Sequence, residues 1–317
     1  MKRAIAGLCL AAAATLASAE YPDRPIHVVV PFAAGGGVDV LARAIGQKLG
    51  DHLKQPVIVD NKPGGNANIG VEFVANAPAD GYTVLIAANG LATNTTLFPD
   101  LKFNVMRDLA PVAYVGYAPL VLVAPESFPA KTLADLIRAA KAKPGELNYA
   151  SAGSGTSQHL AMELLKSTIG IEVMHIPYKG GAPAIVDMLG GRINFMMLNP
   201  LEALPHVKAG RLHALMVGAP QRMALLPDVP NAGEAGVAGY EANTWWGFLV
   251  PARTPPAVIA RLNAEINRTL ADPEVKKKLE DMGVVIQPGT PDQFGAFLRA
   301  ETDKWAGVIR KANIKPE

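Results

Sequence analysis

The sequence predicts an α/β protein of two domains, each with a mainly parallel sheet flanked by helices. Short apolar runs rich in β-branched residues alternate with segments of helical periodicity along most of the chain. Parallel strands need crossover helices between them, so this alternation is typical of α/β layers. The chain has 317 residues, half of them hydrophobic, which is more than one core usually takes.

Seven segments have the length and composition of strands. They are Ile26–Phe32, Pro56–Asp60, Thr83–Ala88, Leu147–Ser151, Glu172–Pro177, Ile193–Leu198 and Leu212–Gly218. Between the first two, apolar residues recur at spacings of three and four from Val38 to Leu53, which predicts a helix. Another helix is expected after Thr132, because Thr132-x-x-Asp135 resembles a capping box.

Two extended, Pro-ringed segments predict crossings between the domains. They read "YAPLVLVAPESFP" (residues 117–129) and "NTWWGFLVPARTPP" (residues 243–256). We expect residues 20–120 and 250–317 to build one domain, residues 121–249 to form an inserted second domain, and hinge strands near 118–127 and 243–252. Two crossing strands beside a cleft allow closure on a ligand. The alternative is one continuous domain with ordinary Pro-rich turns.

The N-terminus predicts export. A short basic region, MKR, precedes the apolar stretch IAGLCLAAAATL and the small residues ASA, which together make a secretory signal peptide over residues 1–19. Cleavage is expected near Ala19. The alternative, a transmembrane anchor, needs about 20 apolar residues. Cys9 is the only cysteine and is expected to leave with the signal peptide, which excludes disulfides, cysteine nucleophiles and cysteine-bound zinc.

Charge excludes the partners that a basic field attracts. The chain carries 30 Lys and Arg and 28 Asp and Glu, and loss of Lys2 and Arg3 leaves 28 of each. A mature chain of net charge near zero has no basic field for nucleic acid or anionic lipid. It also has no evident interface stripe, so we expect a monomer.

A glycine-rich turn after the first strand predicts an anion site. "PFAAGGGVD" (residues 31–39) joins a strand to a helix, and the first N–H groups of a helix lack internal partners and carry its positive dipole end. Phosphate is not the expected anion. The motif G-x-G-x-x-G would need glycine where Val40 stands, and the Gly-Lys-Ser/Thr of a P-loop is absent.

A second turn of the same kind lies in the middle of the chain. "LNYASAGSGTSQHLAMELL" is a strand, a Gly/Ser-rich turn over Ser151–His159, and a helix. Ligands of parallel sheets lie beyond the carboxyl ends of strands, so two facing domains would aim both helix N-termini at one cleft. Each hydrogen bond to a charged group contributes about 1.5–3 kcal/mol. The pair suits a carboxylate, whereas either turn alone is explained by close packing of strand on helix.

The sequence offers little for catalysis or for a metal. Ser154 is flanked by Ala152 and Thr156 and lacks the G-x-S-x-G nucleophile elbow. His159 and Glu163 share a helix face, but no H-E-x-x-H motif or third ligand accompanies them. Trp245 and Trp246 can place only one ring in a pocket, because strand faces alternate. We expect no catalytic residue, metal or cofactor.

Long blocks of the chain are similar to one known family. They include "YPDRPIHVVVPFAAGGGVDVLARAIGQKL", "VDNKPGGNANIGVEFVANAPADGYTVLIA", "YASAGSGTSQHLAMELL" and "HIPYKGGAPAIVDMLGGRINFM". In this order they resemble the Bug-type receptors, the extracytoplasmic solute-binding proteins of tripartite tricarboxylate transporters. The resemblance implies a two-lobed periplasmic binding-protein fold of type II with two hinge strands. It also implies a non-enzymatic receptor in the periplasm that delivers a small carboxylate to membrane permease subunits.

The family pattern places the ligand against both glycine turns and against two further strand ends. Carried onto this sequence, the implied ligand-binding residues are Phe32, Ala33, Ala34, Gly35, Gly36, Asn89, Thr93, Ser154, Gly155, Thr156, Ser157 and Asn199. Two departures from the family pattern matter. The usual P-G-A-G-G-N-I-G turn appears as PGGNANIG over residues 63–70. The usual Phe-Asp-Asn appears as Met197-Leu198-Asn199, so an acid is missing. This weakens the expectation of an amino-acid ligand.

The resemblance does not identify the solute. Di- and tricarboxylates, acidic amino acids and aromatic acids all remain open. Two other functions also remain open from the residues: a secreted serine hydrolase using Ser154 and His159, and a receptor that signals to a sensor kinase.

Overall fold

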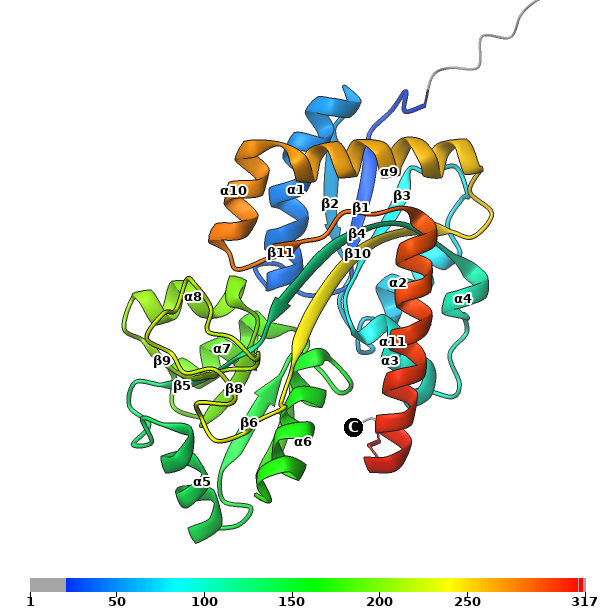
Figure 1. The fold of residues 1–317 in the computed structure, drawn as a ribbon. Coiled ribbons are helices and arrows are strands. Elements are labelled where there is room, and N and C mark those ends of the chain that lie inside the picture. The colour runs from blue at the N-terminus through cyan, green and yellow to red at the C-terminus, as the bar shows by residue number, and fades with distance from the viewer. Residues whose placement is uncertain (1–20, 313, 316–317) are drawn as a thin grey trace, which may run out of the picture.

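The computed structural model describes residues 21–312 and 314–315. The predicted signal peptide, its cleavage site and Cys9 lie outside the described residues. Figure 1 shows two lobes, each a sheet with helices packed on it, joined by long strands that run between them. We call the part around the six-stranded sheet the first lobe and the part around the five-stranded sheet the second lobe.

The sheet of the first lobe has the strand order β11-β4-β10-β3-β1-β2. Its strands are β1 (Ile26–Val30), β2 (Val57–Asn61), β3 (Thr83–Ala87), β4 (Leu109–Pro119), β10 (Asn243–Pro251) and β11 (Val285–Ile286). Strand β1 pairs in parallel with β2 and β3. The other three pairings, β10 with β3, β10 with β4 and β11 with β4, are antiparallel.

The sheet of the second lobe has the order β7-β6-β8-β5-β9. Its strands are β5 (Val121–Pro125), β6 (Asn148–Ser151), β7 (Met174–Pro177), β8 (Phe195–Leu198) and β9 (Leu212–Val217). Strand β6 pairs in parallel with β7 and β8, whereas β5 pairs antiparallel with β8 and β9. The seven strands expected from the sequence are confirmed to within two residues at each end.

The prediction of mainly parallel sheets was wrong, because both sheets are mixed. The cause lies in the crossing strands. Strand β10 returns from the second lobe and inserts antiparallel between β3 and β4, while β5 enters the second sheet antiparallel to both its neighbours. Leu120 separates β4 from β5, and its N–H donates to the Ala242 carbonyl at 2.8 Å. The two crossings therefore lie side by side.

Helices cover both faces of each sheet (Figure 1). They are α1 (Gly37–Leu53), α2 (Asn68–Ala75), α3 (Gly90–Leu97), α4 (Val105–Asp108), α5 (Leu133–Ala142), α6 (Ser157–Ile169), α7 (Gly181–Leu189), α8 (Pro200–Lys208), α9 (Pro256–Ala271), α10 (Pro273–Asp281) and α11 (Pro291–Ala312). The predicted amphipathic helix is α1, whose Leu41, Ile45 and Leu49 pack on the first sheet. Thr132 caps α5 by accepting the Asp135 N–H at 3.1 Å, which confirms the predicted capping residue.

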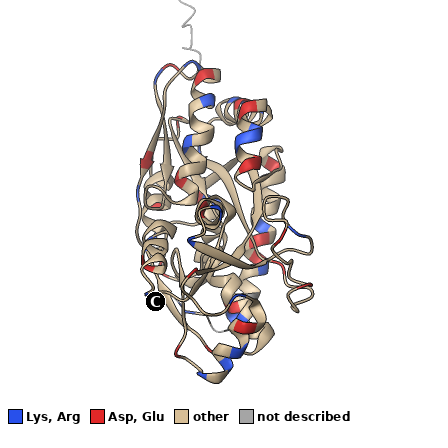
Figure 2. Ribbon diagram, turned by 90° about the vertical axis from the view of Figure 1, so that its left-hand side faces the viewer, with Lys and Arg blue, Asp and Glu red and all other residues tan. Residues whose placement is uncertain are grey.

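Charged side chains of both signs are interspersed over the helices (Figure 2). Among the described residues, no helix is both long and apolar enough to span a bilayer.

Candidate functional site

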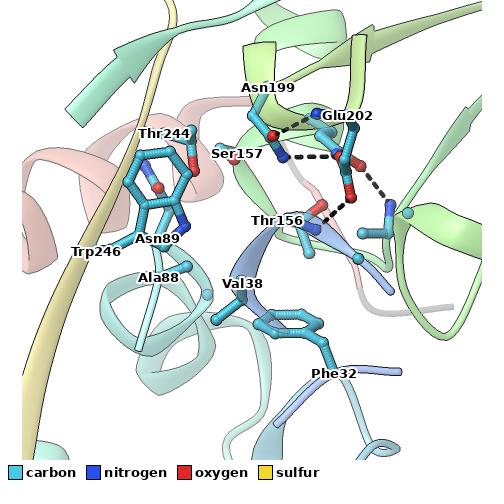
Figure 3. Close-up of a pocket in the computed structure, with 16 residues that line it drawn as sticks. Phe32, Val38, Ala88, Asn89, Thr156, Ser157, Asn199, Glu202, Thr244 and Trp246 are labelled. Atoms are coloured by element: carbon cyan, nitrogen blue, oxygen red, sulfur yellow. Dashed lines mark hydrogen bonds between the residues drawn. The ribbon is translucent and has the colours of Figure 1, made fainter. Parts of the chain in front are cut away.

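A cavity of about 40 Å³ lies between the two lobes (Figure 3). Its lining comes from both lobes: Phe32, Gly36, Gly37, Val38, Ala88, Asn89, Gly90, Ala152, Thr156, Ser157, Gln158, Gly181, Asn199, Glu202, Thr244 and Trp246. Most of these residues follow the carboxyl ends of strands β1, β3, β6 and β8. Ligand sites of α/β sheets lie at this edge, which is where the sequence placed the site.

Five helices begin at this cavity. The first residues of α1, α3, α6 and α7 (Gly37, Gly90, Ser157 and Gly181) line it, as does Asn199, which precedes α8. The first N–H groups of a helix have no internal acceptor, and the helix dipole adds positive potential there. Because helices from both lobes converge, the cavity is rich in donors that favour an anion.

Two helices of the second lobe, α6 and α8, begin at the cavity after polar capping residues. Thr156 precedes α6, and its Oγ1 accepts the His159 N–H at 3.5 Å. Asn199 precedes α8, and its Oδ1 accepts the Glu202 N–H at 3.2 Å. Ser, Thr, Asp and Asn stabilise such positions by accepting an N–H of the first turn. The capping side chains therefore end up at the cavity wall.

Glu202 is a buried carboxylate in the wall of the cavity. Its Oε1 accepts the Gly37 N–H at 2.9 Å, and its Oε2 accepts from Asn199 Nδ2 at 2.7 Å and from Gln158 Nε2 at 3.1 Å. Figure 3 shows these bonds on the side of the cavity opposite the rings of Trp246 and Phe32. Burial raises the pKa of Glu202, and the three donors oppose that rise. Glu202 is the one ionisable residue among the described residues that line the cavity.

Hydrogen bonds between the lobes hold this conformation closed. Thr93 Oγ1 in α3 donates to the Gly155 carbonyl at 2.6 Å. Asn66 Nδ2 of the first lobe donates to the Ser154 carbonyl and, at 2.8 Å, to Asn94 Oδ1.

A glycine is required where the lobes meet, since a Cβ on Gly37 would lie 2.7 Å from Asn199 Nδ2.

Asp39 fixes the first glycine turn. Its carboxylate accepts the Gly35 N–H at 2.9 Å and further bonds from Arg43 and Asn61. Burial raises the pKa of Asp39, but these hydrogen bonds outweigh it and lower the pKa overall. Asp39 is not among the residues that line the cavity. Its position orders the turn that precedes Gly36 and Gly37.

The predicted site residues fall into two groups. Phe32, Gly36, Asn89, Thr156, Ser157 and Asn199 line the cavity. The other six, Ala33, Ala34, Gly35, Thr93, Ser154 and Gly155, lie behind or beside it. In that second group the backbone of Ser154 and Gly155 and the side chain of Thr93 join the lobes, and Ala34 and Gly35 are exposed.

Ser154 and His159 do not form a nucleophile–base pair. Ser154 Oγ is buried without a hydrogen-bond partner among the described residues. His159 Nδ1 accepts the Gly155 N–H at 2.9 Å, and its ring stacks on that of His175 with centroids 3.9 Å apart. Burial lowers the pKa of His159 to about 4. Through its bond to the Gly155 N–H, this histidine stabilises the second glycine turn.

Sequence reasoning missed Glu202, Gln158 and Thr244. The signal for Glu202 was the pattern Asn199-x-x-Glu202 directly after a strand, which is the same type of cap as Thr132-x-x-Asp135. The alternation of the two tryptophans is confirmed, since Trp246 lines the cavity and Trp245 packs against Phe294 and Phe297.

Comparisons with known proteins agree with the geometry. Residues 41–314 match the family model described as tripartite tricarboxylate transporter family receptor. The chain is 37% identical to Protein BugT of Bordetella pertussis over 317 residues, covering 98% of this chain and 97% of BugT.

Two solved structures are similar over nearly the whole chain. The periplasmic binding protein BugD has a TM-score of 0.90 at 30% identity, covering 94% of this chain and all of BugD. Rpa4515 of R. palustris, solved with adipate, has a TM-score of 0.91 at 34% identity, with the same coverage. These likenesses confirm the predicted fold class. The chain belongs to the receptor family of the tripartite tricarboxylate transporters and is similar to its Bug-type members.

Proposed function

We propose that this protein is a periplasmic receptor that captures a small carboxylate between its lobes and delivers it to a membrane permease. The observation that carries the proposal is the convergence of helix N-termini from both lobes on one cavity. Without an arginine or lysine in the described lining, backbone amides and hydroxyls are the groups available to hold an anion.

Ligand binding in this proposal requires that the lobes open and close. A cavity of about 40 Å³ has room for a few water molecules. Each water molecule needs a cavity volume of at least about 10–15 Å³. A dicarboxylate needs more space, so it enters an open form. Rotation about the paired crossings at Leu120 and Ala242 supplies the opening.

Closure is driven by the ligand to the extent that it binds the closed form more tightly than the open one. A carboxylate that bridges the start of α3 in the first lobe and the start of α6 in the second meets this condition. The direct bonds between the lobes, such as Thr93 to Gly155, add to the same equilibrium.

The remaining parts of the proposal rest on the predicted signal peptide, on the near-zero net charge of the mature chain and on the family. The receptor is exported to the periplasm, works as a monomer without cofactor or metal, does not bind nucleic acid, and catalyses no reaction. Ser154 Oγ has no hydrogen-bond partner in the described part of the chain, and His159 Nδ1 is bonded to Gly155, which disfavours the hydrolase alternative. Residues near 120 and 243 mark the boundaries of the inserted domain in this proposal.

A thermal-shift panel tests the receptor function. Mature protein, residues 20–317, is unfolded and refolded to remove ligand carried from the cell. It is then heated with succinate, adipate, citrate, glutamate, 4-aminobutanoate and nicotinate, and with phosphate and an uncharged sugar as controls. A ligand at 100 times its Kd stabilises by about 2.7 kcal/mol, which raises Tm by several degrees. Shifts with phosphate or sugar alone, or with none of the acids, would contradict the proposal.

A further inference from the structure

We propose that Glu202 makes this pocket select an acid with a single carboxylate, and that the far end of the solute is an ammonium group or an uncharged group. This inference rests on the proposed receptor function and names the class of solute for the same cavity. It starts from the one ionisable side chain in the described lining. That side chain carries the same charge as the expected ligand.

The partners of Glu202 show that it is held as a carboxylate. Gln158 Oε1 accepts the Ala152 N–H at 2.7 Å, so the Gln158 amide must turn its Nε2 toward Glu202. Asn199 Oδ1 accepts the Glu202 N–H, so Asn199 also presents its Nδ2. With the Gly37 amide, all three partners are donors, and none of them can accept a proton from a neutral carboxyl group.

Glu202 occupies the anion position at the N-terminus of α1. The Gly37 amide begins the helix whose N-terminus was predicted to hold an anion, and it is already bonded to Oε1 of Glu202. Gly181 at the start of α7 packs so closely that a Cβ there would overlap the Glu202 carboxylate. Two helix N-termini of different lobes therefore surround a carboxylate that the protein itself supplies.

A second carboxylate beside Glu202 is disfavoured. Like charges a few ångströms apart in a partly desolvated site repel each other strongly, and no cation in the described lining offsets them. The donors free for a ligand lie at the starts of α3 and α6, around Gly90 and Ser157. These donors suit one carboxylate.

The rest of the wall suits a short apolar chain with a donor or an ammonium at its end. Trp246, Phe32 and Val38 present apolar surface to the cavity (Figure 3). An ammonium group beside an aromatic ring and a carboxylate gains from both. Glu202 thereby supplies, from α8, the acid that is missing where Leu198 stands.

A role in helix capping alone is the competing explanation. Glu202 is the third residue of α8, where a Glu normally bonds back to the capping residue. The bond to Gly37 crosses from one lobe to the other and is not part of any cap. A pure cap would affect stability but not the choice between solutes, so binding preference separates the two roles.

The test compares pairs of acids of equal length by isothermal titration calorimetry. Refolded mature protein is titrated with acids of three chain lengths. The dicarboxylates are succinate, glutarate and adipate, and the acids with a terminal ammonium group are 4-aminobutanoate, 5-aminopentanoate and 6-aminohexanoate. The acids with an uncharged end are butanoate, pentanoate and hexanoate. The proteins are wild type, Glu202→Gln and Glu202→Ser. Asp187→Asn is the matched control, because it removes one carboxylate of the same lobe that bonds to Tyr178 and Arg192 outside the cavity.

We expect the wild type to bind the monocarboxylates at least 10-fold more tightly than the dicarboxylate of the same length. Both Glu202 variants reduce that ratio at least 10-fold, and Asp187→Asn leaves it unchanged. The Ser variant keeps the test usable if the Gln variant does not fold. Tighter binding of dicarboxylates by the wild type, or an unchanged ratio in a folded Glu202 variant, overturns the inference and leaves the receptor function standing. Absence of binding by every acid of this panel overturns the inference, and absence of a thermal shift with the acids of the wider panel overturns the receptor function as well.

Discussion

The backbone N–H of Gly37 donates to Oε1 of Glu202 at 2.9 Å, across 165 positions of sequence and from one lobe to the other. Gly37 begins α1 of the first lobe and Glu202 lies in the first turn of α8 of the second lobe. A bond of this kind exists only when the lobes are closed. It links the glycine turn, the capping residues of the second lobe and the cavity between them in one arrangement.

Substitution of Gly37 by Ala is expected to block closure. The added Cβ would lie 2.7 Å from Asn199 Nδ2, and that side chain is fixed by its bonds to Glu202. We expect at least 10-fold weaker carboxylate binding by calorimetry. The free energy of unfolding should change by less than about 1 kcal/mol, because Ala is favoured in helices.

Gly295→Ala is the matched control for this substitution. Gly295 lies in α11, where a Cβ would be 3.4 Å from the Pro111 ring, an ordinary contact. Unchanged affinity in Gly37→Ala would show that closure at this point is not required for binding.

Thr93→Val tests the contribution of a single bond between the lobes. The hydroxyl of Thr93 donates to the Gly155 carbonyl at 2.6 Å, and Val keeps the shape without the donor. A lost hydrogen bond of this kind costs about 0.5–1.5 kcal/mol, so binding should weaken about 3- to 10-fold. Thr95→Val in the same helix is the control, since its hydroxyl bonds to Ala92 within the first lobe. Equal losses in both variants would argue against a specific role of Thr93 in closure.

Ser154→Ala separates the receptor from a hydrolase. The Ser154 hydroxyl has no partner among the described residues, so its removal should change the free energy of unfolding by less than about 0.5 kcal/mol. Wild type and variant should both fail to hydrolyse a panel of esters. Turnover by the wild type that disappears in Ser154→Ala would contradict the receptor account.

The stacked histidines predict that acid destabilises the second lobe. Burial lowers the pKa of His159 to about 4 and that of His175 to about 3, below the ordinary value of about 6.5. Below pH 6.5 these two histidines bind protons in the unfolded chain but stay neutral in the folded chain. The free energy of unfolding therefore falls as pH falls toward 4. Each histidine should cost up to about 1.4 kcal/mol per pH unit in this range.

Urea unfolding at pH 7 and pH 5 measures this effect. His159→Asn keeps an acceptor for the Gly155 N–H and should reduce the loss. Equal losses in the wild type and His159→Asn would exclude the buried histidine as the cause.

The order and type of elements could be predicted because each segment carries its own periodicity. Strands β3, β6 and β9 were found within one residue of their ends, and Thr132 signalled the start of α5. The mixed pairing could not be predicted in the same way. The direction of β10 depends on the strands between which it inserts, and β11 has two residues and almost no pattern of its own.

The site was predictable to the extent that it follows strand ends. Phe32, Asn89 and Asn199 each follow a strand and line the cavity. Glu202 could not be assigned to the cavity from sequence, because its bond to Gly37 depends on how the two lobes meet. Trp246 was recognised as one of two candidates, and only the strand register selects it over Trp245.

Fluorescence of Trp246 as the sole tryptophan tests the central claim, that the ligand binds between the lobes. The chain has three tryptophans, and Trp245→Phe with Trp305→Phe leaves the one that lines the cavity. A carboxylate that raises Tm should change the fluorescence emission of this variant until binding saturates. The Kd from this titration should equal the Kd from calorimetry. Adding Gly37→Ala should weaken binding and so increase the Kd. A carboxylate that stabilises the protein while Trp246 emission stays constant up to saturation would place the ligand elsewhere and contradict the account.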